Sequence, residues 1–86
     1  MHLDYTKSFL KQYAKLPRNI QLQTDERILM WQKNPLNPKL KDHPLSGKYQ
    51  GYRSINISGD MRALYRKQGN TIIVFSFIGT HSQLYG

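Results

Sequence analysis

No cysteine occurs among the 86 residues of the chain. Disulfides and thiolate metal sites therefore cannot stabilise the fold, so its core has to come from the apolar residues, which make up 38% of the sequence. No apolar run approaches the roughly 20 residues of a membrane-spanning helix, and residues 1–5 lack the layout of a secretory signal peptide. These absences predict a soluble, cytoplasmic protein without a membrane partner.

Acidic residues are also scarce. Five Asp and Glu stand against thirteen Lys and Arg, which gives a formal net charge of +8 at pH 7. Polyanions are natural partners of so basic a small protein, and nucleic acid fits because basic side chains release the counterions of phosphates. The same charge would also suit an acidic protein partner, or a basic protein whose charge only keeps it soluble.

The N-terminal part has a pattern typical of two helices. After a short edge strand over residues 2–5, Thr6 is a suitable N-cap for a helix over residues 7–16, and Pro17 ends that helix and can begin the next. Apolar positions recur at helical spacing and predict the second helix over residues 18–33. The apolar positions of the two helices are Phe9, Tyr13 and Leu16, then Ile20, Thr24, Ile28, Leu29, Met30 and Trp31.

The rest of the chain combines a loop with strands. Residues 34–48 hold several turn formers, and a loop of this length is often functional. Residues 49–57, 61–67 and 71–79 have the composition and alternation of strands, and the tail 80–86 completes the chain. The order β-α-α-β-β-β predicts an α+β fold, in which a helical hairpin packs on one face of a twisted, mostly antiparallel sheet.

The turn at residues 58–60 decides which side chains share a face of the hairpin formed by the predicted strands 49–57 and 61–67. If all three residues form the loop, Ile57 pairs with Met61 and Asn56 with Arg62. We favour this register because it gathers apolar side chains on one face, whereas a two-residue turn would mix apolar and charged positions. The other face would be open, polar and basic, which suits RNA phosphates and a stacked base. The open face would carry Tyr52, Ser54, Asn56, Arg62, Leu64 and Arg66, and the apolar face Ile55, Ile57, Met61, Ala63 and Tyr65.

The second half contains four short motifs, which are LKDHPLSG at residues 40–47, GYR at 51–53, GDMRALY at 59–65 and GTHSQLYG at 79–86. In their order and spacing they resemble the RelE/ParE superfamily of toxins from type II toxin–antitoxin systems, and most closely its YafQ branch. The resemblance implies a RelE-like fold and a single toxin domain over residues 1–86. It also implies a metal-independent ribonuclease without a cofactor, which enters the ribosomal A site, cuts mRNA and is inhibited by a cognate antitoxin protein. In that reaction the 2′-hydroxyl attacks the neighbouring phosphate and leaves a 2′,3′-cyclic phosphate and a 5′-hydroxyl.

This cleavage needs a base for the 2′-hydroxyl, an acid for the leaving 5′-oxygen and positive charge near the phosphorus. Histidine suits the first two roles because it titrates near working pH, and arginine suits the third because its planar guanidinium pairs with phosphate oxygens. By position in the matching motifs, the resemblance implies catalytic roles for His81, His43, Asp60, Arg62 and Tyr85. It does not decide which histidine is the acid, and ordinary turn, packing or surface roles are the alternatives for each residue.

Asn56 departs from the family pattern. It stands where the YafQ branch has a further histidine and where RelE-like members have lysine, whereas an amide carries no charge and transfers no proton near neutrality. This departure predicts a weaker enzyme, or a division of the work among His43, His81 and Arg62. Expected RNA-binding residues are Asn56, Lys39, Lys41, Lys48 and Arg66, although a solvated charged loop explains the lysines equally well.

Two other functions stay open on the same fold. A ParE-like toxin that poisons DNA gyrase would have no need of His43, His81 and Tyr85, so their joint presence favours the nuclease. A non-catalytic RNA-binding protein stays open because of Asn56. We also expect the fold to survive the loss of His81, because the tail is expected to hold little of the core.

Overall fold

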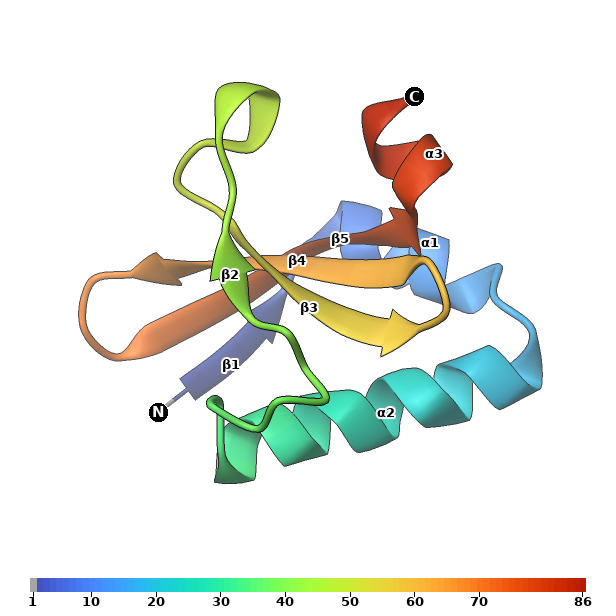
Figure 1. Cartoon of the computed structure of the whole chain (residues 1–86), viewed down its shortest axis with the longest axis horizontal. Coiled ribbons are helices and arrows are strands. Elements are labelled where there is room, and N and C mark those ends of the chain that lie inside the picture. The colour runs from blue at the N-terminus through green and yellow to red at the C-terminus, as the bar shows by residue number, and fades with distance from the viewer. Residues whose placement is uncertain (1) are drawn as a thin grey trace.

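The computed structural model describes residues 2–86, which form a five-stranded sheet with helices (Figure 1). The elements are β1 (His2–Tyr5), α1 (Lys7–Ala14), α2 (Arg18–Lys33), β2 (His43–Pro44), the 3₁₀ turn η1 (Gly47–Tyr49), β3 (Arg53–Ser58), β4 (Met61–Gln68), β5 (Ile72–Thr80) and α3 (His81–Tyr85). The strand order is β1-β5-β4-β3-β2, and only β1 and β5 run parallel. The predicted α+β class and element order are confirmed, with β2, η1 and α3 as additions.

The two N-terminal helices begin where the sequence places their caps. The Thr6 hydroxyl accepts a hydrogen bond of 3.1 Å from the backbone amide three residues later and so starts α1. Pro17 separates α1 from α2 as predicted, but it stands at the N-cap of α2 and not in its first turn, where we expect it. α1 ends earlier than predicted, because the amides of Lys15 and Leu16 bond to carbonyls three residues back and tighten the chain before the proline.

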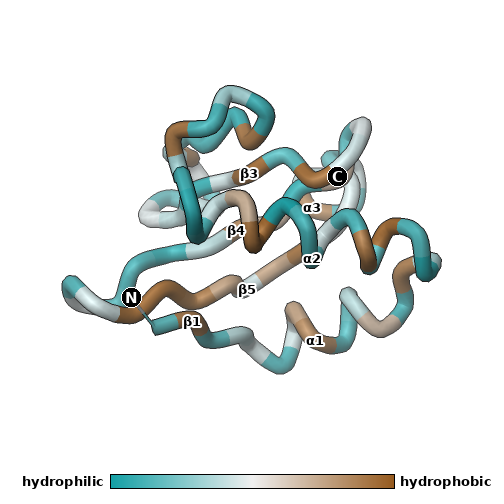
Figure 2. Tube along the Cα trace, turned by 90° about the horizontal axis from the view of Figure 1, so that it is seen from below, coloured by the Kyte–Doolittle hydropathy of each residue, from teal (hydrophilic) through white to brown (hydrophobic). Residues whose placement is uncertain are grey.

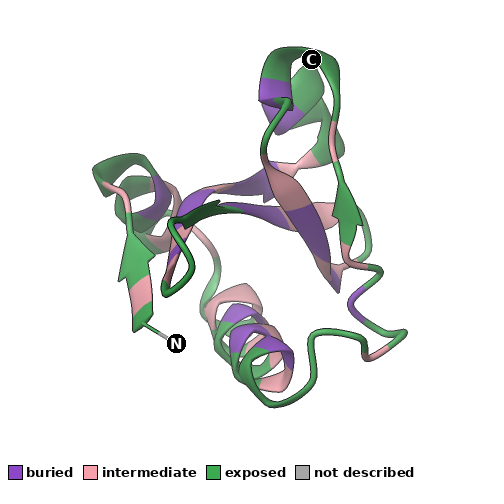
Figure 3. Cartoon of the chain, turned by 90° about the vertical axis from the view of Figure 1, so that its left-hand side faces the viewer, coloured by how far each residue is buried: buried purple, intermediate pink, exposed green. Residues whose placement is uncertain are grey.

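The main core lies between the sheet and the first two helices. β5 is apolar along most of its length (Figure 2) and lies between β1 and β4. α2 lies below the sheet in Figures 1 and 3 and buries the stripe of Thr24, Ile28 and Trp31. Leu29, which we expect in this stripe, is instead 52% exposed because it falls beside the stripe on the helix surface. The buried residues of this core are Phe9, Ile28, Trp31, Leu40, Ile55, Ile57, Ala63, Tyr65, Ile73, Phe75 and Ile78.

A second, smaller core covers part of the opposite face of the sheet. Tyr49 of η1 and Leu84 of α3 pack on Leu64 of β4 there. The prediction of an open face is therefore wrong at Leu64, which is 0% exposed because Tyr49 and Leu84 cover it, and at Ser54, which is 2% exposed on β3 between β4 and β2. The residues of the predicted face that stay partly or fully exposed are Tyr52, Asn56, Arg62 and Arg66.

The β3–β4 hairpin differs from the prediction by a β-bulge. Asn56 pairs with Arg62 as predicted, but Met61 pairs with Ser58 instead of Ile57. The turn is therefore shorter than the expected three-residue loop, and Ile57 is the extra residue of the bulge. The bulge keeps Ile57 in the main core while Asn56 stays on the opposite face, which satisfies the apolar pattern in another way.

The tail, where we expect no secondary structure, forms the short helix α3. Its N-terminus is a capping box, in which the Gln83 amide donates to the Thr80 hydroxyl at 3.2 Å and the Thr80 amide donates to the Gln83 side chain at 2.8 Å. The expectation that the tail holds little of the core is wrong, because Leu84 is buried in the second core. His81 itself is exposed.

Residues 34–48 are largely irregular, as predicted, but they are tied to the sheet. Leu40 is fully buried, and its carbonyl accepts a hydrogen bond of 2.7 Å from the backbone N–H of Asn56. The predicted strand 49–57 begins only at Arg53, because the chain first reverses through Gly51, whose φ is +92°. Among residues 2–86, no helix is long and apolar enough to cross a membrane.

Candidate functional site

Strand pairing gathers several of the predicted site residues at one end of the sheet. Arg62 on β4 pairs with Asn56 on β3 and with Gly79 on β5, so it lies between them. His81 follows Gly79 by two residues and begins α3. Because directly paired residues of antiparallel strands project to the same face, Asn56 and Arg62 lie on the face that α3 partly covers.

His81 and Tyr85 form a ring pair on α3. Their ring centroids lie 4.7 Å apart with an interplanar angle of 34°, as side chains four positions apart on a helix allow. The His81 amide donates a hydrogen bond of 3.1 Å to the Asp60 carbonyl, which ties the start of α3 to the β3–β4 turn. Both rings are on exposed residues and so are accessible to a substrate.

Arg62 is held by only one of its guanidinium nitrogens. Its Nη1 donates to the Asn56 Oδ1 at 2.6 Å, to the Gly59 carbonyl at 2.8 Å and to the Met61 carbonyl at 3.2 Å. The Nε and Nη2 atoms donate to no residue between 2 and 86. The arrangement fixes the guanidinium and leaves donors for a phosphate, and it gives Asn56 a definite role as the acceptor that orients Arg62.

The 3₁₀ turn η1 also contacts α3 and helps to hold it in place. The Tyr49 hydroxyl and the Lys48 ammonium donate hydrogen bonds of 2.8 and 3.3 Å to the Leu84 carbonyl, and the Tyr49 ring lies edge-on to Tyr85 at 5.3 Å. Burial and then the neighbouring Tyr49 raise the pKa of Tyr85 above its ordinary value, and the positive charge of Arg62 opposes them. Tyr85 is therefore a neutral phenol at neutral pH and can donate a hydrogen bond.

His43 lies on the same face but farther from α3. It pairs with Ser54, which pairs with Leu64, which pairs with Phe77. With strands spaced by about 4.8 Å, three such steps separate His43 from β5 by roughly 14 Å, so the two histidines are not in contact. Arg62 lies on β4, and β4 lies between β2, which carries His43, and β5, which leads into α3 and His81.

The hydrogen bond of the His43 ring fixes its proton. The Nδ1 atom lies 2.7 Å from the Lys41 carbonyl oxygen. Because a carbonyl oxygen only accepts, Nδ1 must carry the hydrogen, and Nε2 is then the atom that gains or loses a proton. His43 is exposed, so its Nε2 can meet a substrate.

The other predicted RNA-binding residues and Asp60 are more scattered. Asp60 is exposed in the β3–β4 turn, where only its backbone carbonyl holds α3. Arg66 lies over the Tyr52 ring, 5.8 Å from its centroid, and continues the basic surface along β4. Lys39 is exposed in the loop, and Lys41 lines a cleft on the α2 side of the molecule.

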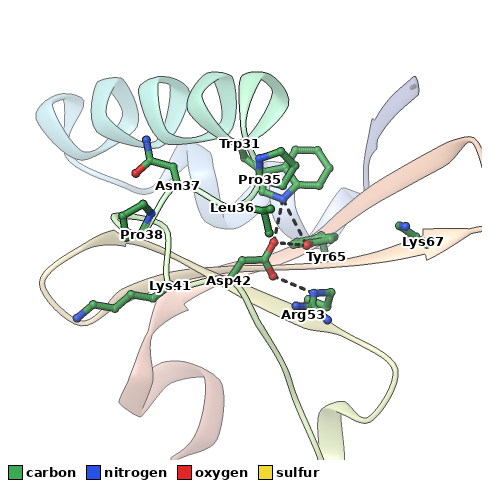
Figure 4. A pocket seen from close by; sticks show the side chains of 10 residues that line it. All are labelled: Trp31, Pro35, Leu36, Asn37, Pro38, Lys41, Asp42, Arg53, Tyr65 and Lys67. Atoms are coloured by element: carbon green, nitrogen blue, oxygen red, sulfur yellow. Dashed lines mark hydrogen bonds and ion pairs between the residues drawn. The ribbon is translucent and has the colours of Figure 1, made fainter.

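That cleft, of about 450 Å³, lies between the C-terminal end of α2, the loop after it and the sheet (Figure 4). Asp42 stands at its wall and accepts hydrogen bonds from Arg53 at 2.9 Å, Trp31 at 3.1 Å and Tyr65 at 2.5 Å. Burial, followed by the bond to Asp42, raises the pKa of Tyr65 to about 12. This cluster is separate from the face that carries Arg62.

Sequence reasoning missed two structural supports of the site. The capping box of Thr80 and Gln83 has a recognisable pattern, a threonine followed three residues later by glutamine, which could have revealed α3. The cluster around Asp42 has no such local signal, because its partners come from α2, β3 and β4. Among residues 2–86, no three His, Asp or Glu side chains gather where they could hold a metal ion.

Comparisons with solved structures define the class of this fold. The crystal structure of YafQ from Escherichia coli strain BL21(DE3) superposes with a TM-score of 0.83 at 24% identity and covers 98% of this chain and 97% of that one. The crystal structure of the E. coli DinJ–YafQ complex matches with a TM-score of 0.71 at 27% identity, over 98% and 97% of the two chains. The fold is thus that of the small RelE-like toxins of toxin–antitoxin systems.

The sequence places the chain within this class. The model of the family described as "Bacterial toxin of type II toxin-antitoxin system, YafQ" matches residues 1–86, and the chain belongs to this family. The mRNA interferase toxin YafQ of E. coli K12 is 38% identical over 52 residues, which are 60% of this chain and 55% of that relative. The match therefore spans about half the length of the curated relative.

Proposed function

We propose that the chain is the toxin of a type II toxin–antitoxin system and acts as a ribosome-dependent mRNA endoribonuclease, or mRNA interferase, that inhibits translation. One feature carries the most weight: on a single face, Arg62 presents free guanidinium donors between His81 on one side and His43 on the other. Membership of the YafQ family and the name of the curated relative support the same activity.

The proposed reaction needs no metal and uses these three side chains. One histidine takes the proton of the 2′-hydroxyl, and the oxygen attacks the adjacent phosphorus. The bond from phosphorus to the 5′-oxygen then breaks, and the other histidine protonates that oxygen, which leaves 2′,3′-cyclic phosphate and 5′-hydroxyl ends. The free donors of Arg62 stabilise the charge that develops on the phosphate oxygens. Because His43 and His81 flank Arg62, they suit an attacking and a leaving oxygen on opposite sides of the phosphorus.

The remaining site residues support this chemistry. Tyr85 stacks on a base or donates its hydroxyl to the phosphate, beside His81. Asn56 accepts a hydrogen bond from Arg62 and keeps it in place. We propose that the fixed guanidinium of Arg62 takes over the work of the titrating group that other family members have at position 56. Asp60 supports the site through its backbone, because its carbonyl accepts the hydrogen bond from the His81 amide that ties α3 to the turn. Basic side chains proposed to hold the RNA backbone are Lys39, Lys41, Lys48 and Arg66.

We also propose that a cognate antitoxin covers this face through an acidic segment in the cytoplasm, and that residues 1–86 are one functional domain. The net charge of +8 favours such a segment. The YafQ toxin of E. coli occurs in a complex with DinJ, which supports an antitoxin partner. Isolating the native complex tests this part, and a lone stable protein without an acidic partner would contradict it.

The nuclease activity is tested by mapping mRNA 5′ ends after adding purified protein to translating ribosomes. We expect new 5′-hydroxyl ends within the A-site codon and matching 2′,3′-cyclic phosphate ends on the upstream fragments. A parallel assay follows supercoiling by DNA gyrase, which we expect to continue unchanged. Intact mRNA together with inhibited gyrase would indicate a ParE-like toxin, and RNA binding without cleavage would indicate a non-catalytic binding protein.

A further inference from the structure

Residues 40–43 place side chains on both faces of the sheet. Leu40 and Asp42 point toward the α2 side, where Leu40 joins the main core and Asp42 meets Trp31 and Tyr65. His43 pairs with Ser54 and so lies on the α3 face. Because successive residues project to opposite faces where the chain enters a strand, anchoring Asp42 just before β2 on one face turns His43 to the other.

Asp42 is held by three hydrogen bonds from other side chains. Its side chain is only 10% exposed, and both carboxylate oxygens accept hydrogen bonds. Oδ1 accepts from the Arg53 Nε at 2.9 Å, while Oδ2 accepts from the Trp31 indole at 3.1 Å and from the Tyr65 hydroxyl at 2.5 Å (Figure 4). These partners come from α2, β3 and β4, so Asp42 joins the loop to three elements of the fold. A charge this enclosed, with charge-assisted hydrogen bonds, holds one geometry.

Lys41 completes the link between this anchor and the histidine. Its neighbours are fixed, Leu40 through burial and a hydrogen bond from the Asn56 amide, and Asp42 through its cluster. Lys41 adopts a φ of +47°, an uncommon conformation for a residue with a side chain. In this conformation its carbonyl reaches the Nδ1 of His43 at 2.7 Å.

We propose that Asp42 is a positioning residue for proton transfer at His43, and that it acts by fixing the Lys41 carbonyl against Nδ1. The ring then keeps its hydrogen on Nδ1 in both the neutral and the charged state, and Nε2 is the only nitrogen that exchanges a proton with RNA. The fixed orientation of the His43 ring can be tested whether or not the protein cleaves RNA. The catalytic consequence rests on the proposed nuclease function.

The fixed tautomer is tested by ¹⁵N NMR of histidine-labelled protein, which distinguishes a protonated from an unprotonated ring nitrogen. In the wild type at a pH where His43 is neutral, we expect a protonated Nδ1 and an unprotonated Nε2. Asp42→Asn places a donor where Arg53 or Tyr65 needs an acceptor, so we expect a mixture of the two tautomers. Arg53→Gln removes one hydrogen-bond donor from Asp42, and because the Arg53 side chain is itself 42% exposed, we expect this variant to fold and to show a smaller change toward mixed tautomers.

Asp25→Asn is the matched control. Asp25 also accepts a hydrogen bond from a tyrosine hydroxyl, that of Tyr13 at 2.8 Å, but it is exposed on α2 and distant in sequence from the loop. The His43 signals should be unchanged in this variant. A wild-type His43 with its hydrogen on Nε2, or an Nδ1–H tautomer that survives unchanged in both Asp42→Asn and Arg53→Gln, would overturn the proposal.

Single-turnover cleavage on translating ribosomes tests the catalytic consequence. We expect Arg53→Gln to lower the rate constant at saturation by about tenfold, because a reacting group is misplaced, with KM changed by less than about twofold because the RNA contacts remain. An unchanged rate constant in a variant with mixed tautomers would overturn the positioning role. If the wild type cleaves nothing while the tautomer still follows Asp42, the proposed nuclease function fails and the fixed histidine stands.

Discussion

At the residue scale, the site depends on the hydrogen bond between Asn56 and Arg62. Asn56 cannot transfer a proton, but its Oδ1 and two carbonyls hold Nη1 of Arg62 and leave the other nitrogens for a phosphate. The pairing of these two residues follows from the alternation of apolar side chains in the sequence. That Asn56 serves as an acceptor for Arg62 could not be predicted, because it depends on side-chain conformations that the alternation does not determine.

Tyr65 allows a pH test of the cluster that holds the loop of His43. Its pKa is raised from 10.0 to about 12, chiefly by burial. A group whose pKa is higher in the folded state stabilises the fold below its unfolded pKa, and this contribution is lost as the pH rises through the folded value. Tyr65→Phe should destabilise the protein at neutral pH, by about 1–3 kcal/mol, because Asp42 loses a hydrogen bond.

The difference in unfolding free energy between the wild type and Tyr65→Phe should therefore narrow as the pH rises from 10 to 12. Urea unfolding of both proteins at several pH values measures it. The same measurement on Tyr13→Phe provides the comparison. The Tyr13 hydroxyl also donates a hydrogen bond to an aspartate, Asp25, but at an exposed site. A difference that stays constant over this pH range would show that Tyr65 ionises as easily in the folded protein as in the unfolded one.

At the scale of elements, the helices and long strands could be predicted and the supports of the site could not. Residues 18–33 were identifiable from their apolar spacing, and β5 from its apolar run. The bulge at Ile57 was missed because one residue more or less in a turn leaves the sequence pattern almost unchanged. β2 depends on its pairing with β3, and the burial of Leu64 depends on contacts with η1 and α3, which no local pattern reveals.

α3 offers a direct test of how an element positions the proposed catalytic groups His81 and Tyr85. Thr80→Ala removes the hydroxyl that accepts the Gln83 amide and should destabilise α3 by about 1 kcal/mol. We expect amide hydrogen exchange at Gln83 and Leu84 to become about fivefold faster, with slower RNA cleavage because His81 loses its fixed place. Ser82→Ala is the control, because the Ser82 side chain is exposed on the same helix. Equal exchange in the two variants would argue against the capping box as the support of α3.

At the scale of the whole molecule, the proposed function makes charge the force that draws RNA to the site. The chain carries a formal charge of +8, and Lys48 and Arg66 lie on or beside the α3 face, whereas Lys7 and Lys11 lie on α1, which packs against the other face of the sheet. Binding that releases counterions weakens linearly on a logarithmic scale as salt rises. Only the charges that contact RNA should therefore contribute to the salt dependence of binding.

We expect the salt dependence of single-stranded RNA binding to identify the binding face. With His81→Ala as background to prevent cleavage, replacing both Lys48 and Arg66 by Gln should reduce the slope of log K against log salt by about 1.4. The matched double replacement of Lys7 and Lys11 by Gln should leave the slope nearly unchanged. Equal slopes for the two double variants, measured by fluorescence anisotropy, would place the RNA elsewhere.

The cleavage rate of His81→Ala on translating ribosomes tests the central claim most directly. The exposed His81 imidazole lies beside Tyr85, whose pKa burial raises and the charge of Arg62 lowers, so the loss of the imidazole should slow cleavage by about 10²-fold or more, with stability within about 0.5 kcal/mol of the wild type. His2→Ala, which removes an exposed histidine from β1, should cleave at the wild-type rate. Equal cleavage by the wild type and both variants would contradict a ribonuclease site built on α3.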